Sequence, residues 1–304
     1  MNTDYIQERS IISNARDLNL RASFESGQPL AFYAGYKIDD GTERLEYVTQ
    51  RGAITVSRKR LEPGRMAYSF IGDYTRRSAY EEIKTRFALD HDMRRIYSHI
   101  NTDPFMNMAI NSFYGMRITG NQPWEAALCF IVSQFNNIKR IRMTTLNLIQ
   151  RFGEKTEAEG VSVRLFPSPQ AIANASTKDI MACGTGFRAK YIKSAAAAFA
   201  ENKEYSGLHR MDYAELKERL MSLDGIGDKV ADCILLFGYS KHEAFPIDVW
   251  IKRIVEKVYF NGRTMRESQI HDFATNRWGA YSGYAQQYLF WHGRSMKTGV
   301  SNDK

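Results

Sequence analysis

Hydrophobic and polar residues follow two different periods along this chain. Between about residues 18 and 75, short segments are aromatic, β-branched or alternating, which is the pattern of half-buried strands. The turn residues Asp39-Asp40-Gly41 and Arg51-Gly52 separate these segments. The pattern predicts a small antiparallel sheet whose candidate strands are residues 30–36, 44–49, 53–58 and 65–74.

From Tyr80 onward the hydrophobic residues recur at helical spacing. Two helices are predicted over 123–133 and 138–152, and Gln134-Phe135-Asn136-Asn137 separates them. The polar stretch 154–164 is predicted to be a loop. Shorter helices are predicted over 80–87, 92–100 and 104–113, from 168 onward, and over 177–183, 188–200, 213–221, 230–237, 249–260 and 281–290.

These two periods predict an α+β fold in which a small sheet domain precedes an all-helical domain. We place the boundary after residue 79, so that residues 1–79 form the sheet domain and residues 80–304 the helical domain. The first helices of the second part could equally be counted with the sheet as a linker, to about residue 115.

The helical segments 213–221 and 230–237 are joined by a stretch too short for anything but a tight turn, Asp224-Gly225-Ile226-Gly227. Its glycines can adopt backbone angles that other residues avoid. The pattern predicts a helix-hairpin-helix. The backbone N–H groups of the turn and of the following first helical turn have no partner inside the helix. Gly225 and Gly227 are therefore candidate contacts to a DNA phosphate.

Two residues near the hairpin carry candidate chemistry. Lys229 falls in the first turn of the second hairpin helix, where the positive end of the helix dipole disfavours a charged amine. A lysine acts as a nucleophile only after it has lost its proton, so this position suits one. Asp248 follows a proline and precedes an apolar stripe, which is the position of an N-cap. The cap would also fix where its carboxylate points.

Charge and cysteine content narrow the class of protein. The formal net charge of +8 favours a polyanionic partner such as nucleic acid. The first residues have no basic and apolar leader, and no apolar run is long enough to cross a membrane. The three cysteines lie far apart, which suits a reducing compartment and excludes a four-cysteine iron–sulfur cluster. The six histidines show no metal-ligand spacing, so we predict no metal and no cofactor.

The hairpin with its lysine, followed by Pro246-Ile247-Asp248-Val249, resembles the helix-hairpin-helix DNA glycosylases, and among them the 8-oxoguanine DNA glycosylase/AP lyase branch. The resemblance extends over nearly the whole chain. Five further segments carry it: 26–28 (Ser-Gly-Gln), 87–90 (the start of the linker), 130–141 (the asparagine-containing helix turn), 186–191 and 283–290.

The resemblance implies a role for each residue of the base pocket. Lys229 would attack the sugar C1′, and Asp248 would assist departure of the base. The carbonyl of Gly27 would accept the hydrogen that 8-oxoguanine carries on N7 and guanine does not. Gln286 would read the Watson–Crick edge of the flipped base. Phe290 and Cys233 would cover its two faces.

The resemblance also implies a second group of DNA contacts, around the gap that the flipped base leaves. Phe187 would wedge into the duplex, and Arg140 and Arg188 would contact the unpaired opposite base. Asn136 and Asn137 belong to the asparagine turn. The members of this second group are Phe135, Asn136, Asn137, Arg140, Phe187 and Arg188.

Three positions depart from the family pattern. Phe135 stands where the family has a third asparagine, so polar recognition of an opposite cytosine is weakened. Trp250 replaces the family's histidine and cannot accept a hydrogen bond. Asp224 replaces the usual hairpin proline, with no evident consequence for phosphate binding.

We therefore predict a bifunctional enzyme that excises 8-oxoguanine through a lysine Schiff base and then cleaves the strand by β-elimination. One alternative is a monofunctional glycosylase for alkylated bases, a class that typically lacks the lysine. Another is a non-catalytic DNA-binding hairpin protein, which needs neither Lys229 nor Asp248. We expect a monomer that binds double-stranded DNA and no membrane. We expect it inside the cell, in the cytoplasm or nucleoid of a prokaryote or the nucleus of a eukaryote.

Overall fold

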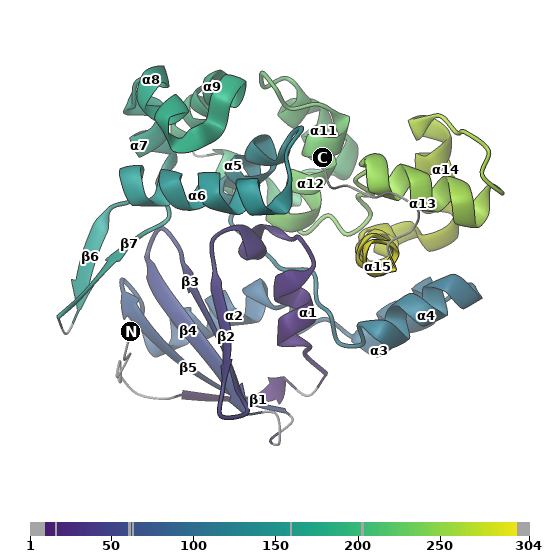
Figure 1. Cartoon of the computed structure of the whole chain (residues 1–304), viewed down its shortest axis with the longest axis horizontal. Coiled ribbons are helices and arrows are strands. Elements are labelled where there is room, and N and C mark those ends of the chain that lie inside the picture. The colour runs from purple at the N-terminus through teal and green to yellow at the C-terminus, as the bar shows by residue number, and fades with distance from the viewer. Residues whose placement is uncertain are drawn as a thin grey trace.

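The computed structural model describes residues 10–296, apart from 16, 60, 61, 63, 159, 202 and 203. An antiparallel sheet near the N-terminus packs beside a larger group of helices, as the α+β prediction required (Figure 1). The sheet has five strands in the order β1-β5-β4-β3-β2. They are β1 (Ser10–Ala15), β2 (Gly35–Asp39), β3 (Thr42–Val48), β4 (Gly52–Lys59) and β5 (Gly64–Gly72).

Alternation along the central strands creates one buried face. On β3 and β4, every second side chain is buried. Leu45 pairs with Val56, and Tyr47 pairs with Ile54, so the four inward side chains share one face of the ladder. The predicted strands over 44–49, 53–58 and 65–74 are confirmed within a few residues at their ends.

The strand predicted over residues 30–36 is wrong for most of its length. Residues Pro29–Phe32 form a short 3₁₀ turn, η1, and all four are buried. Because Pro29 is the first residue of this turn, its fixed φ and missing N–H favour a helical start over a ladder. The strand β2 begins only at Gly35. The short helix α1 (Leu20–Glu25) and the edge strand β1 were not predicted.

The two strongest helix predictions are confirmed to the residue as α5 (Pro123–Ser133) and α6 (Ile138–Phe152). The Asn137 side chain caps α6 by accepting from the Arg140 N–H at 2.9 Å. The remaining long helices are α2 (Arg76–Arg86), α3 (Met93–Ile100), α4 (Pro104–Ser112), α9 (Ala189–Glu201), α11 (Tyr213–Met221), α12 (Asp228–Gly238), α13 (Val249–Tyr259), α14 (Glu267–Trp278) and α15 (Ser282–Ser295). Shorter ones are α7 (Pro169–Asn174), α8 (Thr177–Ile180) and α10 (Glu204–Gly207).

Two segments of the helical half differ from the sequence prediction. The predicted loop 154–164 contains a hairpin, β6 (Lys155–Ala158) paired with β7 (Val161–Arg164). Helix α14 was not assigned at all. The hairpin is mostly polar and its side chains are largely exposed, so it lacks the inward hydrophobic face on which strand prediction depends.

Helix α15 joins the two halves of the molecule. It packs against α13 on one side and against α3 and α4 on the other (Figure 1). The Gln287 amide donates to the Ser26 carbonyl at 2.8 Å, and the Tyr288 hydroxyl donates to the Met116 carbonyl at 3.0 Å. One face of this helix therefore meets the start of the chain and the linker helices. The predicted domain boundary after residue 79 stays a prediction.

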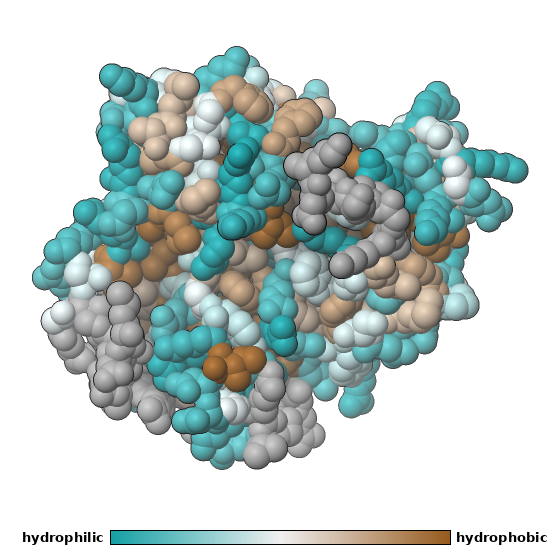
Figure 2. Space-filling model, viewed as in Figure 1, coloured by the Kyte–Doolittle hydropathy of each residue, from teal (hydrophilic) through white to brown (hydrophobic). Residues whose placement is uncertain are grey.

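The surface in Figure 2 is predominantly hydrophilic, with hydrophobic residues showing in a band below α6, where helices meet the sheet. Within the described ranges, no helix combines the length and apolarity needed to cross a membrane. Cys129, Cys183 and Cys233 are buried and free.

Candidate active site

A cavity of about 240 Å³ lies where η1, α5, α6, α12, α13 and α15 converge. Residues from both halves of the chain line it, separated by more than two hundred and fifty positions in sequence. Every residue predicted for the base pocket is among them. The predicted residues in the lining are Gly27, Asn136, Asn137, Lys229, Cys233, Asp248, Gln286 and Phe290.

Lys229 is the second residue of α12, directly after the hairpin turn, and it lines the cavity. Its Nζ donates to Ser133 Oγ at 3.3 Å. The same nitrogen lies 5.3 Å from the centre of the Phe130 ring, whose face attracts a cation. Among the described residues it forms no ion pair with a carboxylate. The amine is thus held by a hydroxyl and a ring, which leaves it accessible to an incoming electrophile.

Asp248 is the N-cap of α13, as its position in the sequence predicted. Its Oδ1 accepts from the Ile251 N–H at 2.8 Å, and its backbone is extended. Only one carboxylate oxygen is used by the cap. The second oxygen remains for a charge that develops in the cavity, and the cap fixes the direction of the carboxylate.

Gln286, Phe290 and Arg294 stand four residues apart on α15 and share one face, which lines the cavity. The Gln286 amide donates to the Pro246 carbonyl at 3.2 Å. Its Oε1 is buried, and no hydrogen-bond partner for it is found among the described residues. A buried acceptor without a partner costs free energy, so a ligand that donates to it would gain that energy back.

Gly27 follows α1 and faces the ring of Phe290. Its φ of +74° lies in the left-handed region, and a Cβ there would lie 3.3 Å from Phe290 Cε1. Its neighbours are fixed by buried amide groups. The Gln28 side chain donates to the Arg117 carbonyl at 2.8 Å and accepts from the Thr119 N–H at 2.7 Å. The Gly27 carbonyl therefore sits on a backbone held from both sides.

Cys233 stands one helical turn after Lys229 and is buried. Burial raises the pKa of its thiol to about 12, although the charge of Lys229 acts in the opposite direction. At neutral pH the group is therefore an uncharged thiol. A small, polarisable and apolar surface of this kind suits contact with the face of a base.

The hairpin turn packs against Tyr191 of α9. Gly225 has a φ of +79°, and any Cβ there would overlap the ring of Tyr191. The Gln134 amide donates to the Gly225 carbonyl at 3.0 Å. Gly227 has an extended backbone and is the N-cap of α12, with open space where a Cβ would lie. Contact between a DNA phosphate and the N–H groups of the first turn of α12 stays a prediction.

Phe135 is the most exposed large hydrophobic residue of the described chain, with 92% of its surface accessible. It has a φ of +45°, which is uncommon for a bulky residue and costs conformational energy. The loop on which it stands is tied down on one side by Asn136, whose amide donates to the Val132 carbonyl at 3.1 Å. A strained and exposed aromatic side chain is a candidate contact to a ligand.

Arg188 supports this loop through hydrogen bonds to its backbone carbonyls. The guanidinium Nε donates to the Gln134 carbonyl at 2.8 Å, and Nη2 donates to the Phe135 carbonyl at 3.1 Å. Burial and the nearby charge of Arg140 lower the pKa of Arg188. Its guanidinium also lies 4.5 Å from the ring centre of Phe187, which is 52% exposed. Arg188 thus holds both exposed aromatic residues, and its contact with an unpaired base stays a prediction.

Sequence reasoning missed a charged cluster on the far side of α12, made of Lys217, Asp228, Asp232 and His271. Lys217 Nζ lies 2.8 Å from Asp228 Oδ1 and 2.9 Å from Asp232 Oδ1. His271 Nε2 lies 3.2 Å from Asp228 Oδ2. A hydrogen bond from His271 holds the pKa of Asp228 well below its usual range. Only the four-residue spacing of the two aspartates was visible in the sequence.

This cluster brings together three potential metal ligands, since atoms of Asp228, Asp232 and His271 all lie within 4.8 Å of one another. The ammonium of Lys217 already contacts both carboxylates, which is the place a cation would take. Burial of the carboxylate raises the pKa of Asp232, and Lys217 counters this effect. We interpret the cluster as a structural ion network that joins α11, α12 and α14.

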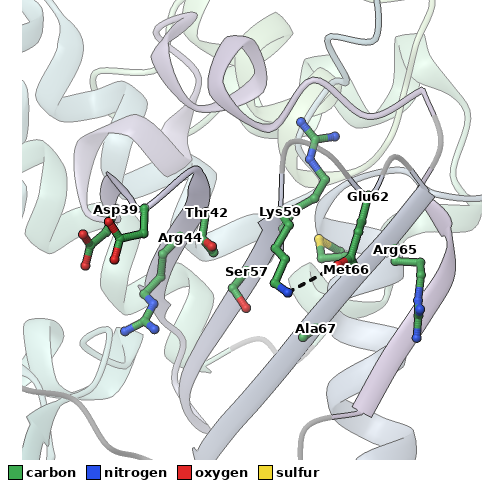
Figure 3. A pocket seen from close by; sticks show the side chains of 11 residues that line it. Asp39, Thr42, Arg44, Ser57, Lys59, Glu62, Arg65, Met66 and Ala67 are labelled. Atoms are coloured by element: carbon green, nitrogen blue, oxygen red, sulfur yellow. Dashed lines mark ion pairs between the residues drawn. The ribbon is translucent and has the colours of Figure 1, made fainter.

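A second and larger cavity, of about 330 Å³, lies in the sheet domain (Figure 3). Asp39, Arg44, Lys59 and Arg65 are among the charged side chains that line it, and Lys59 pairs with Glu62 at 3.3 Å. None of the predicted catalytic or recognition residues lies in this cavity. Its size therefore does not make it the active site.

Comparisons with known proteins agree with this geometry. Residues 128–279 match the family model for HhH-GPD superfamily base excision DNA repair proteins. Residues 10–127 match the model for the N-terminal domain of 8-oxoguanine DNA glycosylase. The probable N-glycosylase/DNA lyase of Methanothermobacter thermautotrophicus is 30% identical over 73% of this chain and 77% of its own length.

Solved structures give the same result for nearly the whole chain. MBOgg1, solved in complex with a low-affinity DNA ligand, is 32% identical with a TM-score of 0.85, over 97% of this chain and 98% of its own. The 8-oxoguanine glycosylase/lyase of Clostridium acetobutylicum was solved with double-stranded DNA containing cytosine opposite 8-oxoguanine. It is 27% identical with a TM-score of 0.83, over 98% of this chain and 100% of its own.

The fold and the hairpin site define a base excision DNA repair protein. The chain belongs to the HhH-GPD superfamily, within the branch that carries the 8-oxoguanine DNA glycosylase N-terminal domain. The family resemblance predicted from the sequence is confirmed.

Proposed function

We propose that this protein excises 8-oxoguanine from duplex DNA and then cleaves the strand through its lyase activity. The observation that carries this proposal is one cavity lined by Lys229, Asp248, Gln286 and the Gly27 loop. A base inside a duplex is out of reach of such a cavity, so the nucleotide must be flipped out, at a cost of a few kcal/mol.

Lys229 acts as the nucleophile. Its neutral amine attacks C1′, the glycosidic bond breaks, and the base leaves with the bonding electron pair. The sugar ring opens to an iminium that joins C1′ to Nζ. That iminium makes the C2′ proton acidic, so loss of this proton expels the 3′ phosphate and cleaves the strand. Asp248 stabilises the positive charge that develops on the sugar, from a carboxylate whose direction the N-cap fixes.

Recognition of the base depends on complementary hydrogen bonds within the cavity. The unpartnered Oε1 of Gln286 accepts from the Watson–Crick edge of the flipped base. The Gly27 carbonyl accepts from the N7–H that distinguishes 8-oxoguanine from guanine. The ring of Phe290 and the thiol of Cys233 cover the two faces of the base.

Two exposed aromatic residues beside the cavity would contact the opposite strand. Phe135 and Phe187 are exposed, and they wedge into the stack beside the gap. Phe135 offers no hydrogen-bonding group, so we propose a weak preference for the opposite base. A monomeric state and an intracellular location stay predictions.

Borohydride trapping tests the lyase chemistry and separates the alternatives. The protein is incubated with a duplex containing 8-oxoguanine and with sodium borohydride, which reduces a Schiff base to a stable covalent bond. We expect a cross-linked product that Lys229→Gln abolishes. Excision without cross-linking would support a monofunctional glycosylase, and DNA binding without excision of any damaged base would support a non-catalytic protein.

A further inference from the structure

Arg294 lines the same cavity as Lys229 and Asp248, and neither the family pattern nor the mechanism above uses it. It stands on α15, four residues after Phe290. Its guanidinium carbon lies 5.5 Å from the ring centre of Trp250 and 5.9 Å from that of Phe290. Within the described part of the chain, no hydrogen bond or ion pair engages its N–H groups.

Two other arginines near this cavity are already engaged by backbone carbonyls. Arg188 donates to loop carbonyls, and Arg142 donates to the Ala31 and Ala34 carbonyls at 2.8 and 2.6 Å. Arg294 is placed differently, because its guanidinium lies over the rings of Trp250 and Phe290. A cation–π contact of this kind uses no hydrogen-bond acceptor, so the N–H groups remain available. Among the residues that the structure describes, the Arg294 guanidinium therefore has free donors and no acceptor. Its planar arrangement of N–H groups matches the oxygens of a phosphate.

The position of Arg294 along α15 indicates which part of a nucleotide it would meet. Gln286 is 6% exposed, Phe290 is half-buried, and Met296 at the helix end is 54% exposed. Arg294 therefore stands at the solvent end of the cavity, one helical turn or about 5.4 Å beyond the residue that stacks on the base. The sugar-phosphate backbone of a flipped nucleotide remains at that end, because it stays connected to the duplex.

We propose that Arg294, placed over the ring of Trp250, binds a backbone phosphate of the flipped nucleotide. This inference rests on the proposed function, since flipping brings those phosphates to the cavity. It also gives a role to Trp250, which stands where the family has a histidine. The indole cannot accept a hydrogen bond, and its ring positions the guanidinium that makes the contact.

The first test measures binding to two duplexes at several salt concentrations. One duplex contains 8-oxoguanine, with Lys229→Gln present to prevent turnover, and the other contains a tetrahydrofuran abasic analogue that keeps the phosphates but has no base. We expect Arg294→Met to weaken both complexes about tenfold or more, as loss of a charge-assisted hydrogen bond implies. The slope of log affinity against log salt should fall by about 0.9, the value for one phosphate contact.

Arg263→Met is the matched control. Arg263 is exposed in the loop after the C-terminal end of α13, whereas Trp250 lies at its N-terminal end. This substitution removes the same charge and should leave the affinity and the salt slope nearly unchanged. An Arg294→Met loss confined to the 8-oxoguanine duplex would mean that Arg294 contacts the base, which overturns the proposal. An unchanged salt slope, or an equal loss in Arg263→Met, would overturn it as well.

The second test identifies the phosphate. A methylphosphonate, which carries no charge, replaces the linkage on the 5′ or the 3′ side of the abasic analogue. At one of these positions the unsubstituted protein should lose affinity, and Arg294→Met should lose no more. Trp250→Ala should weaken binding in the parent protein and have no further effect in Arg294→Met. Additive losses at both linkages would refute the contact.

Two features keep these results interpretable. Melting temperatures are measured for each variant. If Arg294→Met does not fold, Arg294→Lys replaces it, and we expect that variant to keep the salt slope and lose part of the affinity. The abasic arm contains no 8-oxoguanine, so it tests the phosphate contact even if excision of that base fails. If the protein excises 8-oxoguanine but Arg294→Met binds both duplexes with the affinity and salt slope of the unsubstituted protein, only this inference is disproved.

Discussion

The interior of the cavity and its edge are built in different ways. Inside, Gln286 and Cys233 are buried on helices, and the Gly27 loop is fixed by buried amides. At the edge, Phe135 is exposed in the turn between α5 and α6, and Phe187 is exposed in a short 3₁₀ turn before α9. One buried arginine supports both. The interior is held by buried hydrogen bonds, which suits discrimination between closely related bases. The edge presents apolar rings to solvent, which suits insertion into a stack without selection by hydrogen bonds.

Lys229→Gln is the change in the interior with the largest expected effect. It removes the only amine placed in the cavity lining, so strand cleavage and borohydride trapping should be lost. DNA binding should be nearly unchanged, because this is one charge among 42 lysines and arginines. Trapping yield and duplex affinity are measured on the same preparation. Trapping at the level of the unsubstituted protein would assign the chemistry to another amine.

Asp248→Asn tests whether the interior carboxylate is chemical or only structural. Asparagine caps a helix about as well as aspartate, so the melting temperature should hardly change. Single-turnover excision should slow by about 10²-fold, the low end for loss of an electrostatic catalytic group. A variant that melts much earlier and yet excises normally when folded would reduce Asp248 to a cap.

Arg188→Met tests the support of the edge. The substitution leaves the Gln134, Phe135 and Thr185 carbonyls without their charged donor. The free energy of unfolding should fall by about 1.5–3 kcal/mol, as expected for hydrogen bonds to a charged group. Arg140→Met removes the same charge from an exposed side chain and should leave stability unchanged. Equal effects of the two variants in urea unfolding would show that Arg188 does not hold the loop.

Phe135→Asn should make the edge resemble the interior by adding a hydrogen-bonding group. Discrimination for cytosine requires groups that lose a partner when another base is opposite, at about 1–3 kcal/mol for each. The unsubstituted protein should process 8-oxoguanine opposite thymine, guanine or adenine as well, and Phe135→Asn should sharpen the preference about tenfold. Single-turnover excision on four duplexes measures this. A cytosine preference above about a hundredfold in the unsubstituted protein would contradict the prediction.

The sequence predicted the interior better than the edge, for physical reasons. The family resemblance assigned Lys229, Cys233, Gln286 and Phe290 to one pocket, together with Gly27 from the other end of the chain. In the structure the four-residue spacing places Lys229 with Cys233, and Gln286 with Phe290, on one face of a helix. By contrast, the positive φ of Phe135 and the donation of Arg188 to backbone carbonyls leave no trace in residue spacing.

The fold shows the same division. Capping residues and apolar stripes predicted α5 and α6 to the residue, because both helices begin at Pro or Asn signals and bury a clear face. The hairpin of β6 and β7 and helix α14 were missed. The hairpin buries little apolar surface, and the pairing that stabilises it lies between residues rather than in either strand alone. The contact between Arg294 and the Trp250 ring also joins two separate helices and could not be predicted from either one alone.

The contact between Gly225 and Tyr191 restricts which substitutions these positions can accept during evolution. The ring fills the volume that any Cβ at 225 would need, and it meets the edge of the Phe187 ring at 6.3 Å between centres. A larger residue at 225 requires a smaller side chain at 191. A smaller side chain at 191 would in turn remove the contact that positions the Phe187 ring. Positions 187, 191 and 225 should therefore accept substitutions jointly, with the glycine as the last of the three to vary.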